Sequence, residues 1–316
     1  MSAKGLKASL VRFKNNSLVA SAIWIEYLRL RGIASLAFYD DVAAIRKLYH
    51  DYSGRYPDLE APRRFSEKLQ WIKLHERNPL MTICADKFAV REWLTGRGYG
   101  ELLNELVGVY DRVEDIDFAS LPRQFVLKAA HSSGWNIICR DKASLSWFQA
   151  RLVLKAWLRQ NIFWNGREWP YQAMPHRIVC EAYLEDASGS LRDYKFYCFN
   201  GEPRFAQANS GRGEREHVQN FYDLDWKPLP FGKDIAPTTD HHVPAPENLA
   251  RLISIARDLA GPFSYVRVDF YEVAGRPVFG EMTFFPASGL PDFIPDEYDL
   301  VCGEMLDLPI PERQAP

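Results

Sequence analysis

The residues best suited to chemistry lie in the hairpin predicted for residues 265–284. Side chains two apart on a strand share a face, so Arg267 lies beside Asp269 on the first strand and Glu281 beside Thr283 on the second. Charged side chains within apolar strands are costly unless they meet a partner or a metal. Two carboxylates on adjacent strands suit Mg²⁺, which takes one or two carboxylates together with phosphate oxygens. Asp269 and Glu281 are therefore the predicted metal ligands.

This metal site depends on the register of the hairpin. Asp269 faces Glu281 only if the 272–277 connection has an odd length or if a strand contains a bulge, and the same register places Arg267 opposite Thr283. A plain two-residue turn would move Glu281 to the other face. The alternative interpretation is a hairpin whose charges face water.

A phosphate-binding turn is the second candidate feature. Lys128 ends the apolar run Phe125-Val-Leu, and the turn 131–134 (His-Ser-Ser-Gly) follows. Successive backbone amides in such a turn can form a concave anion site, beside which a lysine acts as a point charge. Taken alone, Lys128 is equally typical of an exposed strand end. Lys87, in a predicted third helix, would alone be a surface residue.

A second hairpin brings another lysine to a strand face. Lys195 shares a face with Asp193 and Tyr197, and the Asn200-Gly201 pair predicts the turn. If that turn has two residues, Ala206 and Ala208 lie opposite Lys195 and Asp193, which leaves room for a ligand. Lys195 is thus a candidate to contact that ligand.

The elements around these residues indicate an α+β protein with its nucleotide between layers. Helices are expected within 35–110. They are followed by strands 124–129 and 136–139, a Trp-rich helix at 144–161, a strand at 177–184, the hairpin 193–208, a helix at 247–260 and the hairpin 265–284. We expect the chain to close with that last hairpin.

In this order the motifs resemble the ATP-grasp superfamily, and specifically its TupA-like branch, which is associated with polysaccharide and teichuronopeptide biosynthesis. The resemblance covers roughly residues 50–305. Its carriers are Phe65-Ser-Glu-Lys-Leu-Gln-Trp71, Asp86-Lys87, Val90-Arg91, Phe125-Val-Leu-Lys128, His131-Ser-Ser-Gly-Trp-Asn136, Glu181-Ala-Tyr-Leu184, Asp193-Tyr-Lys-Phe196, Val266-Arg-Val-Asp-Phe-Tyr271 and Gly280-Glu-Met-Thr-Phe284.

The resemblance implies an ATP-grasp fold, in which a small strand-loop-strand lid subdomain and a C-terminal antiparallel-sheet subdomain hold the nucleotide between them. It divides the chain into a basic helical segment (1–50), a helical subdomain (51–115), the lid with its phosphate loop (116–185) and the catalytic subdomain (186–316). The implied cofactors are ATP and Mg²⁺.

The resemblance also implies residue roles. Lys87 and Lys128 would hold ATP phosphates under the mobile loop Ser132-Ser133-Gly134, and the stretch Glu181 to Leu184, with Tyr183, would be the hinge that reads adenine or ribose. Asp269 and Glu281 would bind Mg²⁺, while Lys195, Arg267 and Thr283 would serve catalysis. Thr283 departs from the family, which usually has Asn there. Ser132 departs from the glycine common at that position and restricts the backbone.

The activity implied is a ligase that activates a carboxylate as an acyl phosphate for attack by an amine, on a bacterial surface polysaccharide. The substrates would be a glycan, a uronic acid or an amino acid, and on this interpretation Asp269→Asn and Glu281→Gln abolish ADP release without disturbing the fold. The aromatic cluster 163–171 could stack on a sugar or form core, and Arg212 or Arg215 could clamp the carboxylate. The alternatives are a glycan kinase, a glycosyltransferase or a non-catalytic nucleotide-binding scaffold.

Composition limits the partners and the compartment. A net charge of −2 over 316 residues does not favour nucleic acid. Five scattered cysteines and no recognisable signal peptide fit a reducing cytoplasm. Residues 1–50 hold eight Lys/Arg against three acids, and the apolar run 18–27 is too short to span a bilayer. The N-terminus is expected either to lie peripherally on an anionic membrane or beside a glycan-assembly partner, or to pack on the catalytic body.

No serine or cysteine hydrolase is expected. His131 beside Ser132 and Ser133 lacks an orienting acid at a meaningful spacing, and His241-His242 is expected to be solvated.

Overall fold

The computed structural model describes residues 17–185, 191–210, 218–233, 242–291 and 293–309. The chain forms two compact units. The first unit combines 1–40 with 82–183, and the second combines 41–81 with 184–316, so the chain passes between units three times. The segment 51–115, expected as one helical subdomain, contributes to both units.

The first unit is built on a four-stranded antiparallel sheet in the order β1-β4-β2-β3. Its elements are α2 (Leu18–Phe38), α6 (Ala89–Gly96), β1 (Leu106–Tyr110), β2 (Phe125–Ala129), β3 (Asn136–Cys139), α7 (Trp147–Arg159), α8 (Phe163–Gly166) and β4 (Ile178–Ala182). The short helix α5 (Leu80–Ala85) contains the passage from the second unit. In β2 the outer and central residues Phe125, Leu127 and Ala129 are buried, because alternate side chains face the core under α7.

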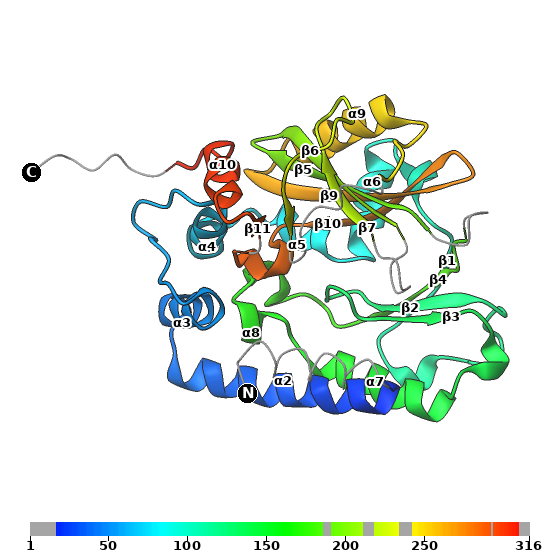
Figure 1. Cartoon of the computed structure of the whole chain (residues 1–316). Helices are drawn as coiled ribbons and strands as arrows, with labels where there is room; N and C mark the ends of the chain where they lie inside the picture. The colour runs from blue at the N-terminus through cyan, green and yellow to red at the C-terminus, as the bar shows by residue number, and fades with distance from the viewer. Residues whose placement is uncertain (1–16, 186–190, 211–217, 234–241, 292, 310–316) are drawn as a thin grey trace, which may run out of the picture. The chain divides into compact units, whose positions relative to one another are not determined.

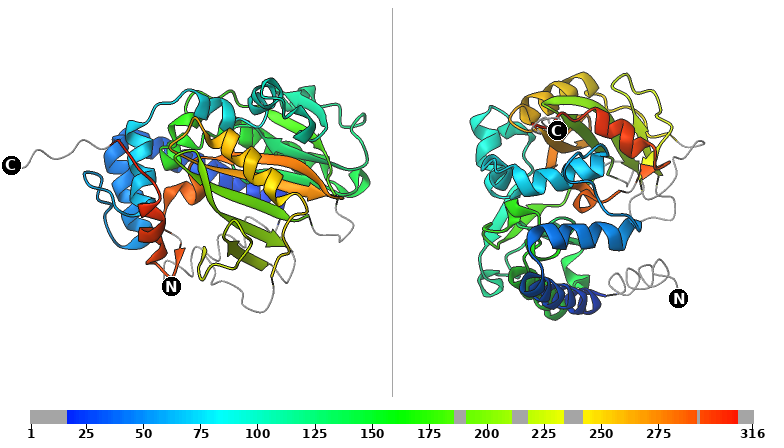
Figure 2. Two further views of the ribbon diagram at one scale, coloured as in Figure 1. Left: turned by 90° about the horizontal axis from the view of Figure 1, so that it is seen from above. Right: turned by 90° about the vertical axis from the view of Figure 1, so that its left-hand side faces the viewer.

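The second unit is built on a five-stranded antiparallel sheet in the order β10-β9-β5-β6-β7. Its elements are α3 (Asp41–Ser53), α4 (Phe65–His75), β5 (Asp193–Phe199), β6 (Glu202–Ser210), β7 (Val218–Tyr222), β8 (Gly232–Lys233), α9 (Leu249–Ala260), β9 (Tyr265–Val273), β10 (Arg276–Thr283), β11 (Phe293–Ile294) and α10 (Tyr298–Glu304). Figures 1 and 2 show α9 along one face of this sheet.

The helix α9 fixes which face of the sheet is apolar. Leu252, Ile255 and Leu259 of α9 are buried, at helical spacing, and α9 contacts β5, β6 and β9. The strand residues on that side are apolar, for example Val268 and Phe270. The polar side chains of the same strands therefore lie on the opposite face of the sheet.

Most predicted elements are confirmed within a few residues, including the strands at 125–129, 136–139 and 193–199. Three predictions are wrong. Residues 106–110 form β1 rather than helix, because β4 offers them a pairing edge. Asp86-Lys87-Phe88 lie in a turn between α5 and α6, where the Asp86 carboxylate accepts from the backbone of Phe88 and Ala89. The chain also does not close with the hairpin, since α10 follows it.

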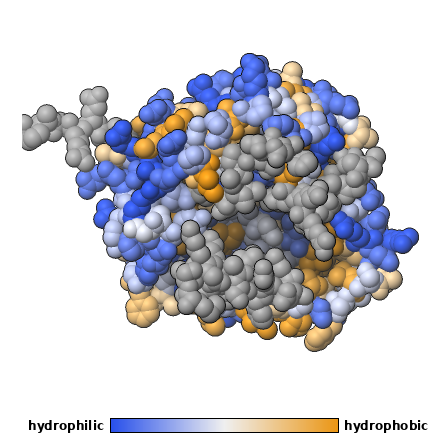
Figure 3. Space-filling view, in the orientation of Figure 1, coloured by the Kyte–Doolittle hydropathy of each residue, from blue (hydrophilic) through white to orange (hydrophobic). Residues whose placement is uncertain are grey.

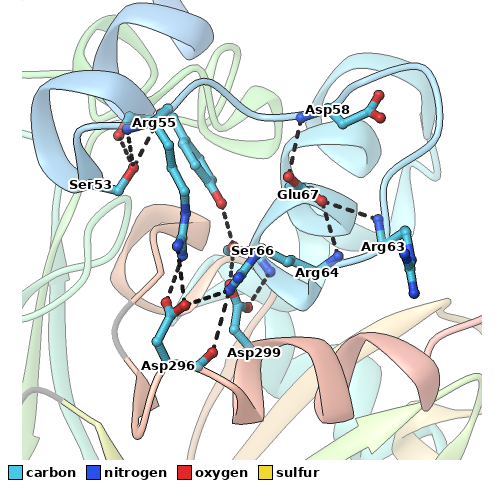
Figure 4. A network of polar contacts seen from close by, with 10 residues as sticks. Ser53, Arg55, Asp58, Arg63, Arg64, Ser66, Glu67, Asp296 and Asp299 are labelled. Atoms are coloured by element: carbon cyan, nitrogen blue, oxygen red, sulfur yellow. Dashed lines mark hydrogen bonds and ion pairs between the residues drawn. The ribbon is translucent and has the colours of Figure 1, made fainter.

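A polar network fixes α10 to the N-terminus of α4 (Figure 4). The backbone N–H and hydroxyl of Ser66 donate to the Asp299 carboxylate at 2.8 and 2.6 Å. Asp299 is fully buried, which raises the pKa of its carboxyl although Ser66 donates to it. Arg55 and Arg64 both pair with Asp296 on the approach to α10. Asp299 thus supplies α4 with the capping acceptor that Arg64 does not provide.

All five cysteines are buried and free, as expected for core thiols. In the described part of the chain, no helix is both long enough and apolar enough to cross a membrane.

Candidate active site

The polar face of the five-stranded sheet brings the predicted metal ligands together. Glu281 on β10 lies directly opposite Asp269 on β9, and Thr283 lies opposite Arg267. The predicted register is therefore confirmed. Their roles in binding metal and in catalysis stay predictions.

This register results from a bulge. The β9–β10 turn has two residues, Ala274 and Gly275, both with positive φ, and Val273 pairs with Arg276. That turn alone would leave Gly280 opposite Asp269 and move Glu281 to the other face. The pairing shifts by one residue between Phe279 and Glu281, which makes Gly280 the extra residue. A Cβ at Gly280 would lie 3.0 Å from the carbonyl oxygen of Asp269, so a side chain at this bulge would press on the backbone of β9.

A second bulge contradicts the expected surroundings of Lys195. Lys195 lies opposite Gln207 rather than Ala206, and Asp193 lies opposite Asn209 rather than Ala208. The register of β5 and β6 shifts beside Pro203, which leaves Arg204 as the extra residue. Amide side chains, and not an open space above alanines, therefore flank Lys195.

Lys195 and Arg267 converge on one carboxylate. The Nζ of Lys195 donates to Asp269 at 2.6 Å and to Asp193 at 2.9 Å. Arg267 donates to both oxygens of Asp269, through Nε at 2.7 Å and Nη2 at 2.6 Å. Glu281 lies at the edge of this group, with Arg267 Nη2 3.5 Å away and the Thr283 hydroxyl donating to it at 3.1 Å. Together these five side chains form a charged cluster of three carboxylates and two cations.

The charges in this cluster are held by mutual pairing. Burial lowers the pKa of Lys195, but Asp193 and Asp269 outweigh it, and the pKa is raised. The pKa of Arg267 is raised in the same way, since burial is outweighed by Asp269. Both cations therefore stay charged, as buried charges do when they have partners.

The donor set fits Mg²⁺ accompanied by phosphate. Three carboxylates against two cations leave the cluster with one net negative charge, and two of those carboxylates face each other across adjacent strands. A carboxylate has about four acceptor positions, and Asp269 uses three for the hydrogen bonds from Lys195 and Arg267. The described residues contain no group of three or more His, Cys, Asp or Glu able to hold a metal by themselves. A bound metal would thus need oxygen ligands from a substrate as well, which is the usual Mg²⁺ arrangement.

Two amide side chains on the same face, Gln207 and Asn209, were not predicted from the sequence. Gln207 accepts from the Tyr197 hydroxyl at 2.8 Å and donates to Asn209 at 3.1 Å. The side-chain nitrogen of Asn209 is buried and has no hydrogen-bond partner among the described residues. Pro203 was the available signal, because a proline within a strand often marks a bulge.

In the first unit, the predicted nucleotide residues Lys128 and Glu181 form an ion pair. The Nζ of Lys128 lies 2.6 Å from Glu181 Oε2, and Arg91 Nη1 lies 3.6 Å from Glu181 Oε1. Strand pairing explains the contact, because Val126 lies opposite Glu181 and Lys128 lies two residues further along the same face of β2. The two residues assigned to opposite ends of ATP are thus direct neighbours in this structure.

The loop 131–134 is tied to Lys87. The Nζ of Lys87 donates to the backbone carbonyl of Ser132. The backbone N–H of Lys87 donates to the carbonyl of Ala130 at 3.3 Å. Ser132 is buried, whereas Ser133 and Gly134 are exposed. Gly134 has a φ of 73°, and a Cβ there would meet nothing within 4 Å. The structure therefore brings Lys87 together with the predicted phosphate loop.

His131 is a core residue. Its Nε2 meets the Trp157 carbonyl at 2.9 Å, and its ring stacks on His176 at 4.2 Å. Burial, together with His176, lowers its pKa to about 4. The Ser132 hydroxyl donates to the Ser133 carbonyl at 3.4 Å and not to this imidazole.

The predicted hinge coincides with a passage of the chain between units. The first unit ends at Tyr183 and the second resumes at Leu184. The backbone of Ala182 is already engaged, since its N–H donates to Glu105 and its carbonyl accepts from Asn104. Tyr183 accepts from Arg140 at 3.1 Å through its hydroxyl. Backbone contacts to a base would therefore fall to Tyr183 and Leu184.

The aromatic cluster belongs largely to the core. Phe163 and Tyr171 are buried, and Trp164 packs against Gly32 of α2. Arg167 is buried beneath them and donates to the carbonyls of Ser35 and Tyr39 at the C-terminal end of α2. Stacking of this cluster on a sugar stays a prediction. Arg212, Arg215 and His241 lie outside the described residues.

Comparison with known proteins identifies the family. A model described as "TupA-like ATPgrasp" matches residues 67–307, well over half of the chain. No curated protein matches the chain significantly.

Solved structures give low similarity. D-alanine–D-alanine ligase from Bacillus anthracis, solved with ATP, is 17% identical with a TM-score of 0.37, over 64% of this chain and 54% of that one. The enzyme from Helicobacter pylori is 11% identical with a TM-score of 0.40, over 77% and 69%. The ligase PsnB, solved with minimal precursor, Mg and ADP, is 12% identical with a TM-score of 0.38, over 69% and 57%. The chain thus spans little more than half of two of these proteins, and we draw no argument from matches at this level. The family model, in contrast, covers all three strands of the charged cluster and the loop beside Lys87, and the chain belongs to the TupA-like ATP-grasp family.

Proposed function

We propose that this protein is an ATP- and Mg²⁺-dependent ligase that activates a carboxylate as an acyl phosphate and passes the acyl group to an amine. The observation that carries the proposal is the register that sets Asp269 opposite Glu281, beside Lys195 and Arg267. Family membership makes ATP the expected phosphoryl donor. A carboxylate of a bacterial surface polysaccharide, such as a uronic acid, is the proposed substrate, and an amino acid is the proposed amine.

The proposed reaction needs positioning and charge neutralisation. A carboxylate oxygen of the substrate attacks the γ-phosphorus, and the bond to the β–γ bridging oxygen breaks to release ADP. The amine nitrogen then attacks the acyl carbon, phosphate leaves, and the nitrogen loses a proton. Mg²⁺, when bound, would neutralise phosphate charge in line with its role in phosphoryl transfer.

Residues of each unit have a proposed role in this reaction. Asp269 and Glu281 would hold the metal, and Lys195 and Arg267 would place positive charge where phosphate and acyl oxygens become negative. Thr283 orients Glu281 through its hydroxyl. In the first unit Lys87 and Lys128 are the proposed phosphate contacts, with Ser132, Ser133 and Gly134 as the covering loop. Tyr183 and Leu184 would meet the base.

The structure changes the choice of test variant. Asp269 holds two buried cations, so Asp269→Asn would disturb the fold as well as the site. Glu281 is 27% exposed in its side chain, and Arg267 Nη2 lies 3.5 Å from its carboxylate, which makes Glu281→Gln the cleaner probe. Glu202→Gln is its matched control, because Glu202 lies in the same sheet but pairs with Arg257 at the surface.

The experiment screens uronic acids and amino acids for ADP release. Release that requires both substrates, and that falls at least about a hundredfold in Glu281→Gln but not in Glu202→Gln, supports the proposal. A phosphorylated product formed without an amine would indicate a kinase, and dependence on a nucleotide sugar would indicate a glycosyltransferase. ATP binding without ADP release from any substrate pair would indicate a scaffold.

A further inference from the structure

The helix α2 has apolar side chains on both of its faces. Its inner face packs on the first unit through Ile25, Leu18 and Ala22, which join the core beneath α7. Its outer face carries Ile23, Tyr27, Leu30, Ala34 and Phe38, spaced by four, three, four and four residues. These five residues, hereafter the α2 outer face, are all exposed, and Leu30 and Phe38 are 60% and 80% exposed.

A helix with two apolar faces is stable in water only if both faces are covered by apolar groups. A surface helix of a water-soluble protein normally turns polar residues outward, whereas a helix that is apolar all round is normally buried. Here one side has the protein core, and the other has no cover from described residues. Exposed apolar surface gathered along one element marks an interaction site more often than scattered single residues do.

The charge around the α2 outer face indicates which partner covers it. Within residues 18–31 of α2 the charged residues are Arg29, Arg31 and a single acid, Glu26. Arg29 pairs with Glu26 at 2.7 Å, and Arg159 of α7 donates to it at 2.9 Å, so that one acid is already neutralised. On α7, Lys155 pairs with Glu114 at 2.7 Å. The positive charge that this region offers to a partner therefore lies on the exposed Arg31 of α2 and the exposed Arg151 of α7.

The neighbouring helix α7 extends the same character. It packs beside α2, and its residues 147–159 contain Arg151, Lys155 and Arg159 but no acid. Phe148 at its start is 72% exposed, and Leu152 one turn later is also exposed. Figure 3 shows apolar side chains along the margin where α2 and α7 run in Figure 1. Apolar and basic side chains on adjacent helices match a lipid surface that is apolar below and anionic above.

We propose that the α2 outer face docks on an anionic membrane surface, with α2 lying in the plane of the interface. Ile23, Leu30 and Phe38 would enter the acyl boundary, Tyr27 would sit at headgroup level, and Arg31 and Arg151 would meet lipid phosphates. This docking does not rest on the proposed ligase activity.

Vesicle flotation of the full chain tests the proposal. Vesicles of phosphatidylcholine with about one-third phosphatidylglycerol should carry the protein, and phosphatidylcholine alone should not. Raising NaCl from roughly 50 to 500 mM should lower binding at least about tenfold, because exposed charges are screened beyond a Debye length. Binding that is equal on both vesicle types would overturn the assignment.

Two variants and one control separate docking from misfolding. The double variant Ile23→Glu/Leu30→Glu should abolish flotation. The double variant Arg31→Gln/Arg151→Gln should weaken flotation roughly fivefold for each arginine that it removes. Val42→Glu on α3 is the matched control, because Val42 is an exposed apolar helix residue in the other unit. All variants should melt within a few degrees of wild type, since each changed side chain is exposed. If the glutamate pair binds vesicles like wild type, or if it only converts a dimer to a monomer while wild type ignores vesicles, the proposal is wrong.

Discussion

Asp269 is the side chain on which the charged cluster depends, and its replacement by Asn gives the sharpest test of the site as a structure. The side chain is 3% exposed and accepts three hydrogen bonds at 2.6–2.7 Å from Lys195 and Arg267. Asn has nearly the same shape, but it is neutral and offers one acceptor oxygen in place of two. The variant therefore leaves Asp193 as the carboxylate beside Lys195, and it leaves Arg267 with Glu281 at 3.5 Å and the Thr283 hydroxyl at 3.1 Å.

The expected cost follows from burial. Removing one partner from a buried ion pair costs roughly 3–5 kcal/mol, because the remaining charge stays out of water without compensation. Glu281→Gln should cost less than about 1 kcal/mol, since that carboxylate is 27% exposed and its contacts are longer. The prediction is thus a difference in the loss of unfolding free energy between variants of two acids that face each other across the same pair of strands.

The measurement is urea unfolding of both variants and of Glu202→Gln. The dependence of the unfolding free energy on urea concentration is compared in each case, because a changed slope would indicate a changed denatured or native state. Lys195→Met added to Asp269→Asn should cost less than the sum of the two single changes, because both changes remove the same Lys195–Asp269 ion pair. Equal and small losses for Asp269→Asn and Glu281→Gln would refute the reasoning. So would a double variant less stable than the sum of its two single changes.

Three further outcomes are expected. The pKa of His131 is about 4 in the folded state against 6.5 in the unfolded state, so the neutral side chain is tolerated without cost above pH 6.5. Up to about 3 kcal/mol of the free energy of unfolding is lost as pH falls from 6.5 to 4. His131→Gln should flatten this dependence of the free energy of unfolding on pH, as measured by denaturation at each pH. A Cβ at position 280 would lie 3.0 Å from the Asp269 carbonyl oxygen, and Gly280→Val adds further side-chain atoms there. This variant should raise the Mg²⁺ concentration needed for ADP release about tenfold, and Gly280→Ala should raise it less. Lys128→Met should weaken ATP about tenfold more than AMP if it contacts the terminal phosphates, whereas Glu181→Gln should weaken both alike; calorimetric binding of the two nucleotides decides this.

The two bulges show what the sequence could and could not determine. Alternation on β9 and β10 predicted that Arg267 lies beside Asp269 and Glu281 beside Thr283, but the two pairs share a face only through an odd connection or a bulge. An isolated glycine within a strand run is a recognised bulge signal, and Gly280 is the bulged residue. The same alternation failed for Lys195, because the bulge beside Pro203 moved Gln207 into the place expected for Ala206. A one-residue change in register exchanges every neighbour of a strand. Proline and glycine within predicted strands were therefore the most informative positions.

The contact between Lys128 and Glu181 was beyond prediction for a different reason. It depends on β4 lying between β1 and β2, an order that sequence proximity does not suggest. Local patterns predict faces and turns, but non-local pairing of strands is decided by packing of the whole sheet. The motif order identified the family, while the partners of its lysines required coordinates.

The charged cluster also bears on how the proposed site would accept its ligands. Lys195 and Arg267 are buried cations, and without ligand they are neutralised by Asp269 and Asp193. On the proposed function, the carboxylates turn toward metal while these two cations turn toward phosphate. Each charge then exchanges one partner for another, and none is left buried and unpaired, which would cost several kcal/mol by the standard of buried ion pairs. A sheet face already holding both signs of charge is thus better suited to alternating between empty and loaded states than a face holding carboxylates alone.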